Sequence, residues 1–156
     1  MNKVVMAFLS IALLWSEFAS AQKKPILQVM VEDTNEAATR CGITKSGIES
    51  IAALTLRNNG IQATTAVTDP YLYVVVTALS GSSSACLFNT LAQVRTIVPM
   101  PLNRVVEFKN RKSPNFASAL LCSSGGVATT SQGRAAIYVQ EVLESDIKDC
   151  LGKLEY

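Results

Sequence analysis

No histidine occurs among the 156 residues of this chain. Histidine is the commonest general base and a frequent zinc ligand, so its absence excludes Ser-His-Asp and Cys-His catalysis and every zinc site that needs an imidazole. The sequence also lacks a C-x-x-C motif, a G-x-x-x-x-G-K-[ST] loop and a G-x-G-x-x-G turn. We therefore predict that the protein is not an enzyme and has no catalytic residue, no cofactor and no metal.

The chain also has little excess charge of either sign, because it has 14 basic and 12 acidic residues, for a net charge of +2. Such a weak balance gives no reason to expect nucleic acid as a partner. The adjacent carboxylates of Glu32 and Asp33 are interpreted as the solvated end of a strand. A basic cluster between Arg104 and Lys112 is interpreted as a solvated loop, with the alternative that the 99–115 loop inserts into a target as an inhibitor would.

The first 21 residues have the three parts of a cleavable secretory signal. Lys3 supplies a positive start, an apolar run follows from Val4 to Trp15, and Ala19-Ser20-Ala21 is an A-x-A cleavage site. The apolar run is too short for a bilayer core, which needs about 20 residues. We predict a signal at 1–21, one globular domain at 22–156, a periplasmic or secreted location, and no stable membrane insertion after cleavage.

All four cysteines, Cys41, Cys86, Cys122 and Cys150, lie beyond that signal. An even number of cysteines in an oxidising compartment predicts two disulfides. Buried free thiols are the alternative.

Hydrophobic periodicity and turn residues predict the elements of the domain. A helix after Cys41 begins at a Thr44 cap or at a Ser46–Glu49 capping box, and ends at Asn58-Asn59-Gly60. A second helix is capped near Thr130 or Ser131 and runs to the carboxyl end. We interpret Gly81, Gly125 and Gly126 as turn residues. The expected strands are 26–31, 61–67, 71–79, 86–98, 116–123 and a short optional one at 105–108.

Strands and helices in this order predict an α+β two-layer sandwich. A mostly antiparallel sheet of four to six strands would carry two helices on one face. If the third strand descends and the second helix climbs beside the sheet, Cys41 and Cys150 meet at one end of the molecule and Cys86 and Cys122 at the other. We therefore expect the pairs Cys41–Cys150 and Cys86–Cys122.

The strand at 71–79 is apolar on both sides, whereas a sheet covered on one face only should be polar on the other. Tyr71, Tyr73 and Val75 are therefore a candidate interaction patch. The alternative is that the long connection after Pro99, or the flank of the first strand, covers them. An uncovered edge strand is a second possible docking point.

Three stretches carry a resemblance to a known group: Leu56 to Ile61, Asp69 to Val74, and Gly125-Gly126 before a long terminal helix. They are similar to small exported bacterial proteins of uncharacterised function with one β-α-β-β-β-α unit, loosely like the amino-terminal domain of TolB, the Tol-system β-propeller protein. The resemblance implies a fold and an envelope location, and no catalytic residues. The expected function is a non-enzymatic binding module with an unknown envelope or extracellular protein as partner. The alternatives are a thiol-based enzyme or redox factor, and a secreted inhibitor.

Overall fold

The computed structural model describes residues 25–79, 84–100 and 115–154. The predicted signal, the basic cluster and the optional strand at 105–108 lie outside these residues. Within the described residues the elements are, in order, β1 (Ile26–Val31), α2 (Glu36–Arg40), α3 (Lys45–Asn58), β2 (Gln62–Thr64), β3 (Tyr71–Leu79), β4 (Ala85–Met100), β5 (Asn115–Ser131), the short 3-10 helix η3 (Gln132–Arg134) and α4 (Ala135–Gly152).

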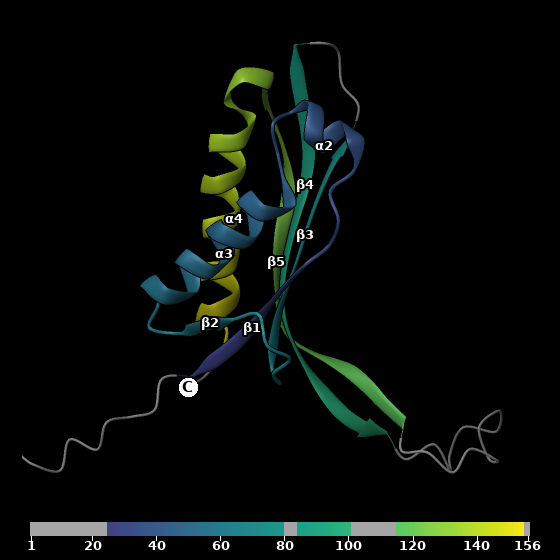
Figure 1. Ribbon diagram of the computed structural model, residues 1–156, viewed down its shortest axis with the longest axis vertical. Coiled ribbons are helices and arrows are strands. Elements are labelled where there is room, and N and C mark those ends of the chain that lie inside the picture. Colours follow the sequence, from purple (N-terminus) through teal and green to yellow (C-terminus); the bar gives the residue numbers. More distant parts are fainter. Residues whose placement is uncertain (1–24, 80–83, 101–114, 155–156) are drawn as a thin grey trace, which may run out of the picture.

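The fold is α+β, as predicted, with one five-stranded sheet in the order β2-β1-β3-β4-β5. Helices α3 and α4 lie on one side of that sheet, and the short helix α2 lies near one end of it (Figure 1). The sheet is mixed rather than mostly antiparallel, because β1 pairs with both β2 and β3 in parallel. The β3–β4 and β4–β5 pairings are antiparallel.

Helix α3 begins and ends where local chemistry predicts. Thr44 is its cap, and the Thr44 Oγ1 accepts a hydrogen bond of 3.2 Å from the Gly47 amide. At the other end Gly60 has a φ of 78°, a left-handed conformation that glycine adopts without strain. The amide of Ile61 then donates to the Leu56 carbonyl at 2.9 Å, which closes a Schellman motif. The alternative start at Ser46 is not used.

The core lies between the sheet and the two long helices. Strand β3 alternates strictly, with Leu72, Val74, Val76 and Ala78 buried against the helices. Phe88 of β4 is fully buried and meets the Tyr138 ring of α4 edge-on, with 6.1 Å between ring centroids. The other large buried side chains come from the helices and from β4: Ile48, Leu56, Val94, Val139, Leu143 and Ile147.

All four cysteines are in disulfides, but the predicted pairing is wrong. The bridges are Cys41–Cys86 and Cys122–Cys150, with Cα–Cα distances of 6.2 Å and 5.3 Å. The first ties the end of α2 to the start of β4, and the second ties β5 to the last turns of α4. On the chain-entropy model the two bridges stabilise the fold by about 4 kcal/mol each.

One wrong strand direction accounts for the wrong pairing. Strand β2 has only three residues and lies on one side of β1, while β3 lies on the other side and runs parallel to β1. The predicted layout had the third strand descend, yet β3 rises to the end of the molecule where α2 lies (Figure 1). Strand β4 therefore starts beside Cys41, and the directions of β5 and α4 are inverted with it.

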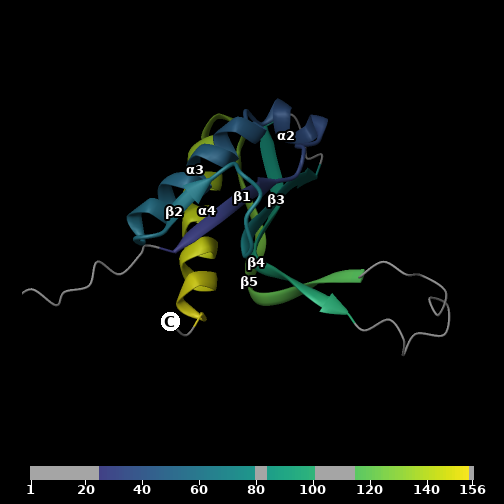
Figure 2. The ribbon, with the colours of Figure 1, turned by 60° about the horizontal axis from the view of Figure 1, so that its bottom comes forward.

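Strands β4 and β5 pair with each other along their whole lengths and extend past the end of β3. Arg95 pairs with Leu120 and Val94 pairs with Cys122, so Leu121 is the extra residue of a bulge. Beyond this bulge, residues 95–100 and 115–121 form a two-stranded projection, which we call the arm. Figure 2 shows the arm leaving the body of the domain. Gly125 and Gly126, predicted in a turn, lie inside β5.

Candidate functional site

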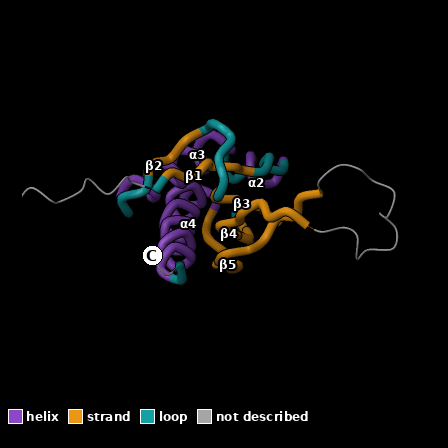
Figure 3. The backbone as a smooth tube through the Cα atoms, turned by 90° about the horizontal axis from the view of Figure 1, so that it is seen from below, coloured by secondary structure: helices purple, strands orange, loops and turns teal. Residues whose placement is uncertain are grey.

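The face of the sheet opposite the helices carries the predicted interaction patch. Tyr71, Tyr73 and Val75 are half-buried and alternate with the core residues of β3, so they point away from α3 and α4. We call this surface the open face. Seen along the sheet, both long helices lie on one side of β3 and β4 (Figure 3). Among the described residues no helix covers the open face.

Side chains of neighbouring strands bury the two tyrosines in part. The Tyr71 hydroxyl lies 2.9 Å from the Ser118 Oγ of the arm, within hydrogen-bonding distance. The Arg95 guanidinium lies over the Tyr73 ring, 4.8 Å from its centroid, and its Nε donates to the Gln93 Oε1 at 2.9 Å. These contacts fix the rings in place while leaving part of each exposed.

Apolar side chains continue the open face on both sides of β3. Met30 lies next to Tyr73 in the β1–β3 register and is 41% exposed. Val127 of β5 lies opposite Asn89, which in turn lies opposite Thr77, and it is 68% exposed. Leu79 at the end of β3 is also exposed. The patch predicted from β3 alone is therefore part of a broader surface.

Sequence reasoning did not predict the arm, although most of its residues fall in the predicted strands 86–98 and 116–123, because nothing in the sequence indicated that these strands extend past the end of β3. Phe116 is 63% exposed, and Ile97, Leu120 and Leu121 are exposed as well. The base of the arm is held by Asp69, whose carboxylate accepts from the Ile97 amide at 2.9 Å and from the Thr96 hydroxyl at 3.0 Å. The signal that could have revealed the arm is the apolar sequence of 116–121. The neighbouring strand already fills the core, so these apolar residues have no place left in it.

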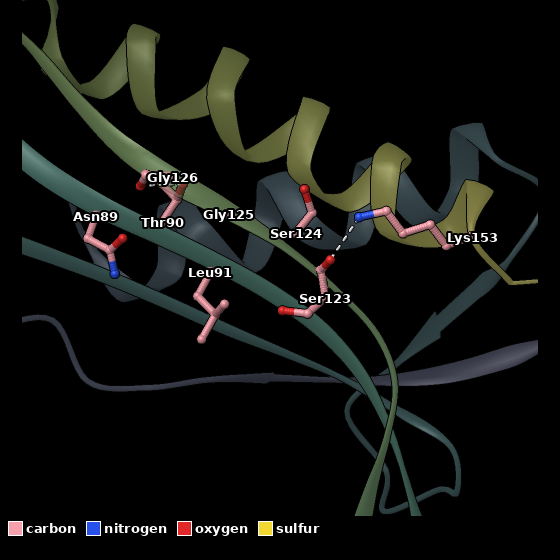
Figure 4. Close-up of a pocket in the computed structure, with 8 residues that line it drawn as sticks. All are labelled: Asn89, Thr90, Leu91, Ser123, Ser124, Gly125, Gly126 and Lys153. Carbon is pink, nitrogen blue, oxygen red and sulfur yellow. Dashed lines mark hydrogen bonds between the residues drawn. The ribbon is translucent and has the colours of Figure 1, made fainter.

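A shallow notch lies beside the outer edge of the sheet, next to Gly125 and Gly126, which Figure 4 shows with the other lining residues. It has a volume of about 460 Å³ and is lined by Asn89, Thr90, Leu91, Ser123, Ser124, both glycines and Lys153. Strands β4 and β5 approach closely here, because a Cβ on Gly125 would lie 2.3 Å from the Thr90 carbonyl oxygen. The Lys153 Nζ donates to the Ser123 carbonyl at 2.9 Å, so that ammonium is already occupied.

A buried carboxylate lies behind this notch. Asp146 of α4 is 9% exposed and accepts a 2.6 Å hydrogen bond from the Thr90 hydroxyl. A longer bond of 3.4 Å comes from the Ser124 hydroxyl. These bonds compensate the loss of hydration and tie α4 to β4 and β5, which is a structural role. Sequence reasoning missed Asp146 because it sits between apolar neighbours on the buried face of the helix.

The two carboxylates at the end of β1 are exposed, and one of them forms an ion pair. Asp33 forms an ion pair with Lys45 at the start of α3, with 2.7 Å between Nζ and Oδ1. The hydrogen bond from Lys45, reinforced by its charge, lowers the pKa of Asp33, and the hydrogen bond to Asp33 raises the pKa of Lys45. Glu32 is exposed, and its amide donates to the Val74 carbonyl.

Cys86, Cys122 and Cys150 are buried, and Cys41 is half-buried. Within residues 25–79, 84–100 and 115–154 no group of three or more cysteine or acidic side chains is placed to hold a metal ion. No helix in this part of the chain is long and apolar enough to cross a membrane.

Comparisons with known proteins give little beyond this geometry. No family model matches the chain, and no curated protein matches it. A solved structure of a PelC variant, a dodecamer from Paraburkholderia phytofirmans, aligns over 83% of this chain and 85% of its own, with 14% identity and a TM-score of 0.39. A likeness of this strength assigns no family.

Proposed function

We propose that this protein is an exported, non-enzymatic binding module of the bacterial envelope that docks another protein through the open face and the arm. The observation that supports the proposal best is the exposed apolar surface of the arm. Phe116, Leu120 and Leu121 lie on a two-stranded ribbon that leaves the body of the domain. Such ribbons are marginally stable alone in water, and exposed apolar patches mark interaction sites.

The open face and the arm form one surface. The hydrogen bond between Tyr71 and Ser118 joins them, and Arg95 covers Tyr73 at the point where the arm begins. A partner seated here would meet rigid aromatic rings flanked by aliphatic side chains, a composition enriched in protein interfaces. Arg95 is the single charged side chain in the described arm, so the surface suits a protein better than a nucleic acid, whose phosphates need several cations.

The thiol-based alternative receives less support from the geometry. Both disulfides have at least one fully buried partner, and the Cys122–Cys150 bridge is buried at both ends. Exchange requires a thiolate to reach a sulfur atom, so a labile redox bridge would be exposed. The bridges are better explained as structural links in a protein that folds outside the cytoplasm.

Capture from an envelope extract tests the proposal. The mature protein should retain a defined partner, and two variants should lose it: Tyr71→Ala with Tyr73→Ala, and Phe116→Ser with Leu120→Ser. The matched control is Ile137→Ser, because Ile137 is an exposed apolar residue of α4, 59% exposed and on the far side of the molecule. The captured partner should then bind the purified domain with the same variant pattern.

Equal recovery of every partner by all variants would contradict the proposal. Export is checked separately, by cell fractionation and by sequencing the mature amino terminus. That terminus should be Gln22. A protein recovered intact from the cytoplasm, with its first 21 residues attached, would refute the envelope location while leaving the docking surface open to its own test.

A further inference from the structure

A second surface, away from the open face, lies between α3 and the edge strand β2. It is a groove of about 380 Å³, lined by Val29, Glu49, Ala53, Arg57 and residues 63–65. This volume falls within the range of small-ligand sites. Figure 1 shows β2 beside the carboxyl half of α3, at the edge of the sheet.

The two charged residues of the groove lie at its two ends. Glu49, Ala53 and Arg57 are spaced by four residues, so they form one row along α3. At 1.5 Å per residue, the Cα atoms of Glu49 and Arg57 are separated by about 12 Å. Both residues are exposed, and in the described part of the chain neither side chain has a hydrogen bond or a salt bridge, although the charge of Lys45, one turn before Glu49, attracts the Glu49 carboxylate. The groove therefore presents an anion at one end and a cation at the other.

The floor of the groove is small and uncharged. Ala53 comes from the helix, while Val29 and Ala63 come from the sheet. Strand β2 pairs with β1 alone among the described strands, so its other side carries backbone groups without a strand partner. An extended chain lying along β2 could hydrogen-bond to these groups, as in strand addition.

From this arrangement we propose that the groove binds a short peptide with free termini and small side chains. The peptide's ammonium group would pair with the Glu49 carboxylate and its carboxylate with the Arg57 guanidinium. An extended chain spans about 3.3 Å per residue, so three residues cover about 10 Å and match the separation of the charges. Ala53 and Ala63 leave room for alanine-sized side chains. This site is independent of the proposed docking surface.

Titration with tri-alanine, followed by amide chemical shifts in the mature protein, tests the inference. Shifts should concentrate on 49–57 and 62–65, with a millimolar dissociation constant typical of a small, exposed site. Acetylating the amino terminus or amidating the carboxyl terminus should each weaken binding about three- to tenfold, because each change removes one exposed charge-assisted contact. A peptide of six alanines should bind more weakly than tri-alanine, because its termini cannot reach both charges while it lies extended.

Charge variants of the groove test whether Glu49 and Arg57 bind the termini of the peptide or have a structural role only. Glu49→Gln and Arg57→Gln should each weaken tri-alanine about as much as blocking the matching terminus does. Glu141→Gln and Arg134→Gln make the same charge changes at exposed positions elsewhere and should leave binding unchanged. The double exchange of Glu49→Arg with Arg57→Glu should restore affinity, with the peptide reversed.

Three results would overturn the inference. The first is an absence of shifts at 10 mM tri-alanine in protein whose spectrum shows that it is folded. The second is a set of shifts located outside the groove. The third is equal affinity for the free and blocked peptides.

Discussion

Gly125 and Gly126 are adjacent residues of one strand, yet an alanine should be tolerated at only one of them. A Cβ at Gly125 would lie 2.3 Å from the Thr90 carbonyl oxygen and 3.0 Å from the Leu91 Cα, and both are backbone atoms that no side-chain rotation can move. A Cβ at Gly126 would have no atom within 4 Å. Neither glycine has a positive φ. The two substitutions are therefore matched in chemistry and differ in space alone.

For Gly125→Ala the strands must separate by about 1 Å to reach an ordinary contact of about 3.4 Å. Overpacking of this kind costs roughly 1–3 kcal/mol, which corresponds to a fall in Tm of roughly 5–10 °C for a domain of this size. Gly126→Ala should leave Tm unchanged or raise it slightly, because alanine reduces the entropy of the unfolded chain. Thermal unfolding followed by circular dichroism measures both. Equal Tm values for the two variants would refute the close approach of β4 and β5.

Three further predictions concern the bridges, the buried carboxylate and the ion pair. Peptide mapping without reduction should recover Cys41 linked to Cys86, and recovery of any other partner for Cys41 would reject the strand directions described above. Thr90→Val should cost roughly 1–3 kcal/mol in urea unfolding because it leaves the Asp146 carboxylate with one long hydrogen bond, whereas Thr90→Ser, which keeps the hydroxyl, should retain most of that stability. The pKa of Asp33 should lie below its ordinary value in an NMR titration, because Lys45 donates a hydrogen bond to the carboxylate and attracts its charge. The stability from this pair is therefore present above the unfolded pKa of Asp33 and is lost as the pH falls through the lower, folded pKa. Lys45→Gln should bring the Asp33 pKa back toward the ordinary value, and an unchanged pKa in that variant would show that the ion pair does not form in solution.

Local signals in the sequence predicted those features that depend on interactions between residues close together in the chain. The cap at Thr44, the left-handed Gly60 and the alternation of β3 are properties of a few neighbouring residues, and all three are confirmed. The strand at 26–31 has the predicted bounds, and the sandwich class follows from the order of the elements.

The failures concern relations between distant parts of the chain. No residue pattern within 61–70 indicates that β2 and β3 lie on opposite sides of β1. The position of β3 beside β1 determines its direction, and the directions of β4, β5 and α4 follow from it. Gly125 resembles a turn residue because its real partner, the Thr90 backbone, lies 35 residues earlier in the sequence. The arm was missed for a similar reason, because the point at which β3 stops covering β4 depends on a register between distant residues.

The disulfide pattern has a consequence for how the protein matures. The cysteines are bonded in the order in which they occur along the chain, the first to the second and the third to the fourth, so the two covalent loops, 41–86 and 122–150, do not overlap. In the proposed amino-terminus-first export, the first pair would emerge before the second, and pairing in order of emergence would give the connectivity of the structure. On that proposal a donor of oxidising equivalents would be sufficient for maturation, without an isomerase.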